Sequence, residues 1–247
     1  MLPCALNTPA LPPRLLALAN LVPPGRVVAD IGTDHALLPI HLVGSGRAPR
    51  AIATDVSPAS LAKARAAVAA AGLSERIALR RGSGLSTLRP GEAAVLVLAG
   101  LGGLSIAQIL AEGYAAARAA ELLLLQPMRH AEELRRRLAA DGFRLANEVL
   151  ARERQRFYVI MAAEPGPMPA YPEALLAVGP LLVARPDPLL KPYLEMRIAR
   201  ERRIYARIEK AACSAAGRAR ARLALERVRA WEELLDAGGS SPCGGHR

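Results

Sequence analysis

The sequence is poor in aromatic residues and in cysteine, and each shortage argues against a class of protein. Aromatic residues make up only 3% of the 247 residues, which disfavours binding of nucleic-acid bases on aromatic platforms. The three cysteines, Cys4, Cys213 and Cys243, are scattered and lack metal-ligand spacing. We therefore expect incidental thiols in a reducing cytoplasm and no metal centre. No apolar run is long enough to span a bilayer, and the N-terminus lacks the pattern of a signal peptide.

Several motifs of enzyme chemistry are missing as well, whereas positive charge is abundant. The chain has no phosphate-binding P-loop and no nucleophile–base pair. It carries 33 Lys and Arg against 22 Asp and Glu, a net charge of +11. A GC-rich genome, which favours arginine and alanine, explains part of this excess. A basic surface nevertheless favours polyanionic partners, nucleic acid first, through arginine–phosphate contacts.

Strand and helix patterns alternate through the first two-thirds of the chain. The five predicted strands are 27–30, 51–55, 77–81, 95–98 and 122–125. Helical segments follow four of them, and the third leads into a glycine turn at 82–84. Two more strand-like runs, 143–152 and 156–163, are separated only by a short charged turn. They predict an antiparallel hairpin at the edge of a parallel sheet. Such an α/β arrangement is typical of the Rossmann-like, seven-stranded sheet of class I methyltransferases. In a dehydrogenase domain, by contrast, strands and helices would continue to alternate to the end of the sheet.

A proline-rich linker at 164–174 precedes a basic helical segment. Residues 189–236 carry 12 Lys and Arg against seven Asp and Glu. We predict two antiparallel helices with Gly217 at the turn, because apolar residues recur there at helical spacing: Leu190, Leu194 and Ile198, then Ala224, Val228, Trp231 and Leu235. The positive charge of this hairpin suits nucleic-acid phosphates, and a dimerising coiled coil built on its apolar seam is the alternative. We place the domain boundary between 1–165 and 166–240.

Acidic residues follow the first two predicted strands. Asp30, Gly32 and Asp34 lie in DIGTDH at the end of the first strand, and Asp55 ends the second. Carboxylates repel phosphate and suit hydroxyl, ammonium or sulfonium groups. An acidic residue at the end of the second strand is the usual partner of a ribose diol. Capping of the next helix by Asp34 or by Asp55 is the structural alternative. NAD is the weaker ligand choice because no GxGxxG cradle follows the first strand, whereas S-adenosylmethionine has no phosphate.

Glycine-rich and amide-containing motifs follow the other strands. AGLGG at 99–103 allows close approach of the backbone to a cofactor or base, or forms a flexible turn. In LLLQPMRH at 123–130, Gln126 can contact a base edge and Pro127 can present carbonyl groups. His130 is as consistent with a helix start as with catalysis.

Together, the motifs DIGTDHALLP, RRGSGL, AGLGG, LLLQPMRH and VGPLL, in this order, resemble the bacterial tRNA (adenine-22-N1)-methyltransferase family, from about Leu15 to Leu235. The resemblance implies a class I methyltransferase that uses S-adenosyl-L-methionine and holds tRNA partly through its C-terminal hairpin. By position, it assigns the cofactor to Asp30, Gly32, Thr33, His35, Asp55, Ser83, Gly84, Ala99, Gly100, Gly102 and Gly103.

The resemblance also implies catalytic and substrate-side residues. We expect Asp34, Gln126 and His130 to act at the reaction centre, and tRNA to be contacted by Pro127, Arg129, Arg200 and Arg203. Ser83 and Met128 depart from the family pattern, which has Asp and Asn there. The alternatives are the same fold acting on another RNA site, an RNA-binding relative without activity, and an NAD-dependent oxidoreductase. We expect a monomer, with a homodimer through the helices as the alternative.

Overall fold

A computed structural model describes residues 10–185, 187–211 and 214–239 of the chain. By its internal contacts the chain divides into two units, Met1–Pro169 and Ala170–Arg247. Cys4, Cys213 and Cys243 all lie outside the described residues, so the expectation of incidental thiols stays a prediction.

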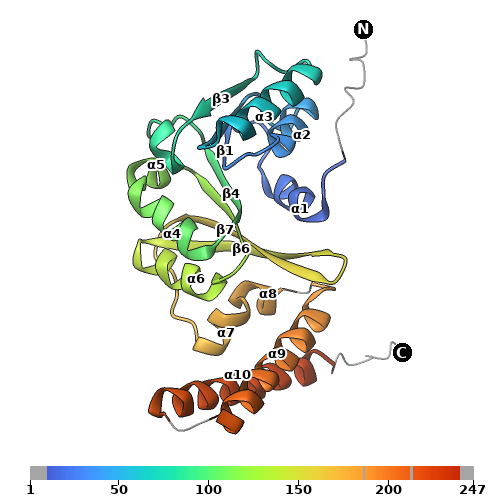
Figure 1. Ribbon diagram of the computed structural model, residues 1–247, viewed down its shortest axis with the longest axis vertical. Helices are drawn as coiled ribbons and strands as arrows, with labels where there is room; N and C mark the ends of the chain where they lie inside the picture. The colour runs from blue at the N-terminus through green and yellow to red at the C-terminus, as the bar shows by residue number, and fades with distance from the viewer. Residues whose placement is uncertain (1–9, 186, 212–213, 240–247) are drawn as a thin grey trace, which may run out of the picture. The chain divides into compact units, whose positions relative to one another are not determined.

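A seven-stranded sheet forms the centre of the first unit and confirms the predicted fold class (Figure 1). Its order is β3-β2-β1-β4-β5-β7-β6, with β7 antiparallel to both of its neighbours and the first five strands parallel. The strands are β1 (Val28–Ile31), β2 (Ala51–Asp55), β3 (Ile77–Arg81), β4 (Val95–Leu101), β5 (Leu122–Pro127), β6 (Phe143–Glu153) and β7 (Arg156–Pro165). The central strands are apolar because helices cover both of their faces.

The helices of this unit form two groups on opposite faces of the sheet (Figure 1). One group is α1 (Pro13–Leu21), α2 (Leu37–Gly44) and α3 (Pro58–Ala70); the other is α4 (Gly103–Glu112), α5 (Tyr114–Ala119) and α6 (Ala131–Ala140), and a 3₁₀ turn, η1 (Gly84–Thr87), follows β3. Helix α3 begins as its sequence predicts: Pro58 occupies the first turn and the Ser57 hydroxyl accepts the Ser60 N–H at 3.3 Å.

Buried side chains fix the layers on both sides of the sheet. Leu18 of α1, Leu42 of α2 and Leu124 of β5 are completely buried in the core. On the other helical layer, the buried Arg135 of α6 forms an ion pair with Glu148 of β6 at 2.7 Å. That pairing ties α6 to the outer strand.

The second unit contains α7 (Glu173–Val178), α8 (Pro180–Ala184) and the two long helices α9 (Leu190–Ala211) and α10 (Ala215–Gly239). Helices α9 and α10 pack against each other as the predicted hairpin (Figure 1). Their shared seam contains the predicted apolar residues Leu194, Ile198, Ala224, Val228 and Trp231, all buried. None of the described helices has the length and apolar character needed to cross a bilayer.

The predicted turn at Gly217 is wrong, because Gly217 lies in the first turn of α10. Ser214 precedes this helix, and its hydroxyl accepts the backbone N–H of Gly217 at 3.0 Å. A serine that satisfies a free N–H group starts a helix effectively. Helix α9 ends at Ala211 and α10 begins at Ala215, so Gly217 lies past the start of the second helix.

Candidate active site

The candidate site lies where the order of the parallel strands reverses, between β1 and β4. Chain connections leave these two neighbouring strands in opposite directions across the sheet, which opens a crevice at their carboxyl ends. Asp30 of β1 lies opposite Val97 of β4 in the register, and the glycine motif 99–103 ends β4. The fold thus brings the motifs that follow the first and fourth strands to one edge of the sheet.

Asp30 is a buried carboxylate at this edge. Its side chain accepts a hydrogen bond from the Thr33 hydroxyl at 2.6 Å, and the residue is only 7% exposed. Burial raises the pKa of Asp30 to about 6; the Thr33 hydrogen bond opposes this rise and the nearby Asp55 carboxylate adds to it. An acid held in this way gains from a cationic ligand, because the ligand stabilises its ionised form.

Asp55 connects the loops that follow β1 and β2. One carboxylate oxygen accepts the Ser57 N–H at 2.8 Å and the other accepts the Asp34 N–H at 3.3 Å. Because Ser57 is the N-cap of α3, the alternative that Asp55 caps this helix is wrong. Each oxygen keeps a lone pair that can accept a hydroxyl group.

The glycine bend after β1 differs from a phosphate-binding loop. The N–H groups of Gly32 and Thr33 both donate to the Thr54 carbonyl, at 2.8 and 2.9 Å, so they are not turned towards a ligand. Gly32 has φ +80°, and among the described residues no atom lies within 4 Å of the place where a Cβ would stand. A ligand can approach the backbone closely on this side.

Asp34 and His35 form the outer edge of the crevice. Both side chains are exposed, and His35 Nε2 lies 3.4 Å from an Asp34 carboxylate oxygen. The alternative that Asp34 caps the next helix is wrong: the N-cap of α2 is Ala36, which has a left-handed backbone and makes no side-chain capping bond. The Asp34 carboxylate is therefore left accessible to a substrate.

The glycine turn after β4 is held by the tip of β5. The completely buried Gln126 accepts the Gly100 N–H with its side-chain oxygen at 3.2 Å, and its amide nitrogen lies 3.4 Å from the sulfur of Met128. Gly100 has φ +76°. The structure thus brings Ala99 and Gly100 together with Gln126 and Pro127, but it uses the Gln126 amide to fix the turn.

Gly103 joins the same two loops by direct backbone packing. Its N–H donates to the Arg129 carbonyl at 2.8 Å. A Cβ at Gly103 would stand 2.3 Å from the His130 carbonyl oxygen, which leaves no room for any side chain. His130 itself has φ +58° at the start of α6 and an exposed side chain. The next glycine, Gly102, lies beside the Arg129 side chain.

Ser83 and Gly84 follow β3 on the far side of Asp55. The Gly82 N–H donates to the Asp55 carbonyl at 3.2 Å, which places this loop beside the tip of β2. The Ser83 carbonyl accepts the Ser86 hydroxyl at 2.6 Å, and the Ser83 side chain is exposed. It can therefore meet a ligand held by Asp55.

Arg14 was not foreseen from the sequence. Its backbone N–H donates to Glu153 at 3.0 Å, and its guanidinium Nη1 lies 4.0 Å from the position that a Cβ on Gly100 would take. No motif marks either residue of this pair, which is formed by segments 139 positions apart.

The second unit carries a separate basic site. Three arginines of α9, Arg200, Arg203 and Arg207, line a hollow of about 400 Å³ together with Arg220 of α10. Ile204 and Ile208 of α9 complete its lining. Four guanidinium groups around one hollow favour an anion such as phosphate. Across residues 10–185, 187–211 and 214–239, no group of three or more His, Cys, Asp or Glu could hold a metal ion.

Fold and site together define a methyltransferase, and comparison with known proteins agrees. The Methyltransferase domain family matches residues 11–161. The tRNA (adenine(22)-N(1))-methyltransferase of Bacillus subtilis (strain 168) is 31% identical over 238 residues, which cover 94% of this chain and 100% of the relative. The chain belongs to the tRNA (adenine(22)-N(1))-methyltransferase family.

Solved structures show the same likeness. The crystal structure of the Bacillus subtilis M1A22 tRNA methyltransferase TrmK has a TM-score of 0.81 at 30% identity, covering 92% of this chain and 99% of that one. A Streptococcus pneumoniae protein crystallised in complex with S-adenosyl-L-methionine has a TM-score of 0.78 at 30% identity, covering 92% and 100%. Both likenesses extend over the sheet and the helical hairpin alike.

Proposed function

We propose that the protein transfers the methyl group of S-adenosyl-L-methionine to N1 of adenine 22 in tRNA. Membership of the family supports this reaction. The observation that carries it is the pair of carboxylates, Asp30 and Asp55, on adjacent strand tips beside the open bend at Gly32. A sulfonium nucleoside matches carboxylates, whereas a dinucleotide needs free N–H groups for its phosphates.

The residues present fit this cofactor. Bound S-adenosyl-L-methionine supplies a methyl group on a positively charged sulfur. The cationic methionine part would stabilise the ionised form of Asp30, whose pKa burial raises to about 6. Asp55 would accept the ribose hydroxyls, and Ser83 and Gly84 would border the adenine ring.

The chain's own residues would act mainly by positioning the target base. Adenine N1 has a free lone pair, so no strong general base is required, and in-line alignment supplies most of the rate. Gln126 keeps the turn at Gly100 in place, with Pro127 and His130 on the side of the base. The ring becomes positively charged as the methyl group arrives, and the exposed Asp34 carboxylate would stabilise that charge.

The target adenine must leave its base pair, because N1 lies on the pairing edge. We propose that 1–165 bind the cofactor and that 166–240 hold the tRNA backbone through Arg200, Arg203 and the hollow that they line. Arg129, exposed at the tip of β5, would contact the RNA near the base. We further propose that the protein works as a monomer in the cytoplasm.

Mass spectrometry of nucleosides tests the reaction. Unmodified tRNA incubated with the protein and S-adenosyl-L-methionine should gain 1-methyladenosine at position 22, and tRNA with guanine at that position should gain none. An Asp30→Ala variant should lose cofactor binding in calorimetry and lose the product. A methyl group at another nucleotide would indicate a different RNA site, and cofactor binding without any product would indicate a relative that has lost activity. Absence of cofactor binding would refute the proposal altogether.

A further inference from the structure

The turn between β6 and β7 projects from the edge of the sheet that carries the site. Strand β7 is antiparallel to both β5 and β6, so β6 runs parallel to β5 and ends at the same edge. Leu125 of β5 lies opposite Met161, whereas β7 begins five residues earlier, at Arg156. At about 3.4 Å per residue the hairpin extends roughly 17 Å past Leu125. Figure 1 shows this paired ribbon reaching beyond the other strands below α1.

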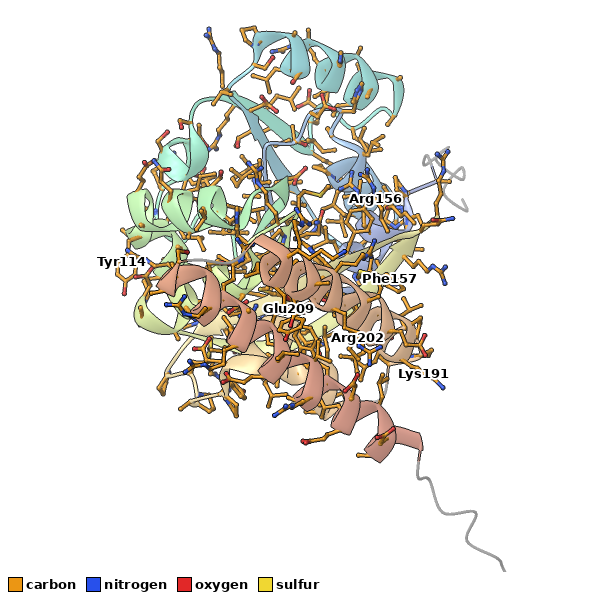
Figure 2. All side chains as sticks on the ribbon, turned by 60° about the horizontal axis from the view of Figure 1, so that its bottom comes forward. Tyr114, Arg156, Phe157, Lys191, Arg202 and Glu209 are labelled. Atoms are coloured by element: carbon orange, nitrogen blue, oxygen red, sulfur yellow. The ribbon has the colours of Figure 1, made fainter. Side chains whose placement is uncertain are left out.

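This turn is strongly basic. Arg152, Arg154 and Arg156 are all exposed, and Glu153 is the only acidic residue in the sequence between 149 and 158. The Arg152 guanidinium lies 5.3 Å from the centre of the Phe157 ring, and its Nε donates to the Arg154 carbonyl at 3.1 Å. Figure 2 shows Arg156 and Phe157 on this hairpin. These contacts hold the Arg152 side chain in place, and the turn carries three arginines against one acidic residue.

Arg14 connects the basic turn with the reaction centre. A Glu153 carboxylate oxygen accepts the Arg14 backbone N–H and lies 3.7 Å from Arg14 Nε. The one acidic residue of the turn therefore pairs with Arg14 of α1. The other end of the Arg14 side chain lies beside Gly100, in the turn that we place next to the target base. Arg14, Arg152, Arg154 and Arg156 therefore form one basic strip, the arginine rim, from the crevice outwards.

We propose that the arginine rim binds the phosphates that flank the methylated adenine. This inference rests on the proposed function. When the target adenine leaves its base pair and enters the crevice, the phosphates on either side of it must lie at the entrance. A guanidinium group forms two parallel hydrogen bonds with a phosphate, which fixes the strand more firmly than a single charge. The rim belongs to the same unit as the cofactor residues, whereas the hollow at Arg200 belongs to the second unit.

The test removes two rim charges without disturbing the hairpin. Arg154 has φ +54°, a backbone conformation that asparagine tolerates. Arg156 lies opposite Glu153 in the strand register, so a neutral glutamine there places no second negative charge beside Glu153. The variant is therefore Arg154→Asn with Arg156→Gln. Arg50→Gln is the matched control, since Arg50 is exposed immediately before β2, at the opposite edge of the sheet.

The expected result is a change in tRNA binding alone. The dissociation constant for unmodified tRNA at 0.1 M salt should rise about tenfold, and the slope of its logarithm against the logarithm of salt should fall by about 1.5 for two lost phosphate contacts. The dissociation constant of S-adenosyl-L-methionine and the circular dichroism spectrum should not change. Arg50→Gln should alter tRNA affinity less than twofold. Arg14→Gln should raise the KM for tRNA with unchanged cofactor affinity.

Two outcomes separate this inference from the proposed function. Unchanged tRNA affinity and salt slope in the double variant would overturn the inference and leave the rim with the role of protecting an edge strand from aggregation. If the wild-type protein instead binds tRNA through the rim but forms no 1-methyladenosine, the proposed reaction is wrong and the RNA contact stands.

Discussion

Replacing Asp30 by asparagine should make the cofactor-free protein more stable at neutral pH while it weakens cofactor binding. The buried carboxylate is costly to ionise without a countercharge, and asparagine has nearly the same shape without the charge. The Thr33 hydroxyl, which now donates to Asp30 at 2.6 Å, can donate to the amide oxygen as well. The substitution therefore removes an ionisation cost and leaves the packing in place.

The size of the effect follows from the pKa. A rise from 3.8 to about 6 corresponds to about 3 kcal/mol, at 1.36 kcal/mol per pH unit. The folded protein holds this proton more tightly than the unfolded chain does. Protonation of Asp30 therefore contributes fully to the unfolding free energy of the wild type below pH 3.8, and this contribution is lost as the pH rises through about 6. The difference in unfolding free energy, variant minus wild type, should grow from near zero at pH 3.8 to about 3 kcal/mol above pH 7.

Urea unfolding of the two proteins between pH 4 and pH 8 measures this difference. Circular dichroism is the suitable probe, because the single tryptophan, Trp231, belongs to the second unit and its fluorescence serves as an internal control. Asp34→Asn, at an exposed neighbouring position, should change the unfolding free energy by less than about 0.5 kcal/mol. A difference for Asp30→Asn that stays constant with pH, or a less stable variant at pH 7.5, would refute the reasoning.

Three further changes follow from the same structure. Affinity for S-adenosyl-L-methionine should rise up to about tenfold per pH unit until about pH 6 and then level off, because the ligand binds ionised Asp30; calorimetry between pH 5 and pH 8 checks this, and a flat profile would contradict it. Arg200→Gln with Arg203→Gln should weaken tRNA binding about tenfold at 0.1 M salt, whereas Arg229→Gln, exposed elsewhere on α10, should not; equal losses in a filter-binding assay would count against the hollow. Gly103→Ala should lower the unfolding free energy by about 2 kcal/mol, since its Cβ would stand 2.3 Å from a backbone carbonyl oxygen; wild-type stability in urea would show that the loops can separate.

Local signals in the sequence were sufficient for most of the fold. Ser57 and Pro58 start α3 as their types predict, and the strands 51–55 and 77–81 have the predicted bounds. The turn at Gly217 failed because glycine is only one way to reverse a chain, and the capping hydroxyl of Ser214 starts α10 before it. Helix α5 was not predicted, since Gly113 and a run of only six residues conceal it.

Proximity within the site was predictable only between neighbouring strands. Asp30 and Asp55 meet because β1 and β2 are adjacent parallel strands with known ends. The contact between Gln126 and Gly100 depends on the side-chain rotamer of a buried amide, which no pattern specifies. Arg14 and Glu153 meet only because α1 crosses the β6–β7 hairpin, and residues so distant in the chain carry no shared sequence signal.

The backbone packing of Gly103 against the β5–α6 loop has a consequence for how such an enzyme diversifies. Because the carbonyl groups of Arg129 and His130 fill the space at Gly103, neither loop can lengthen or tilt without the other. A descendant that acquires a new target nucleotide would have to do so by exchanging the exposed side chains of Met128 and Arg129. The scaffold around them would be inherited unaltered.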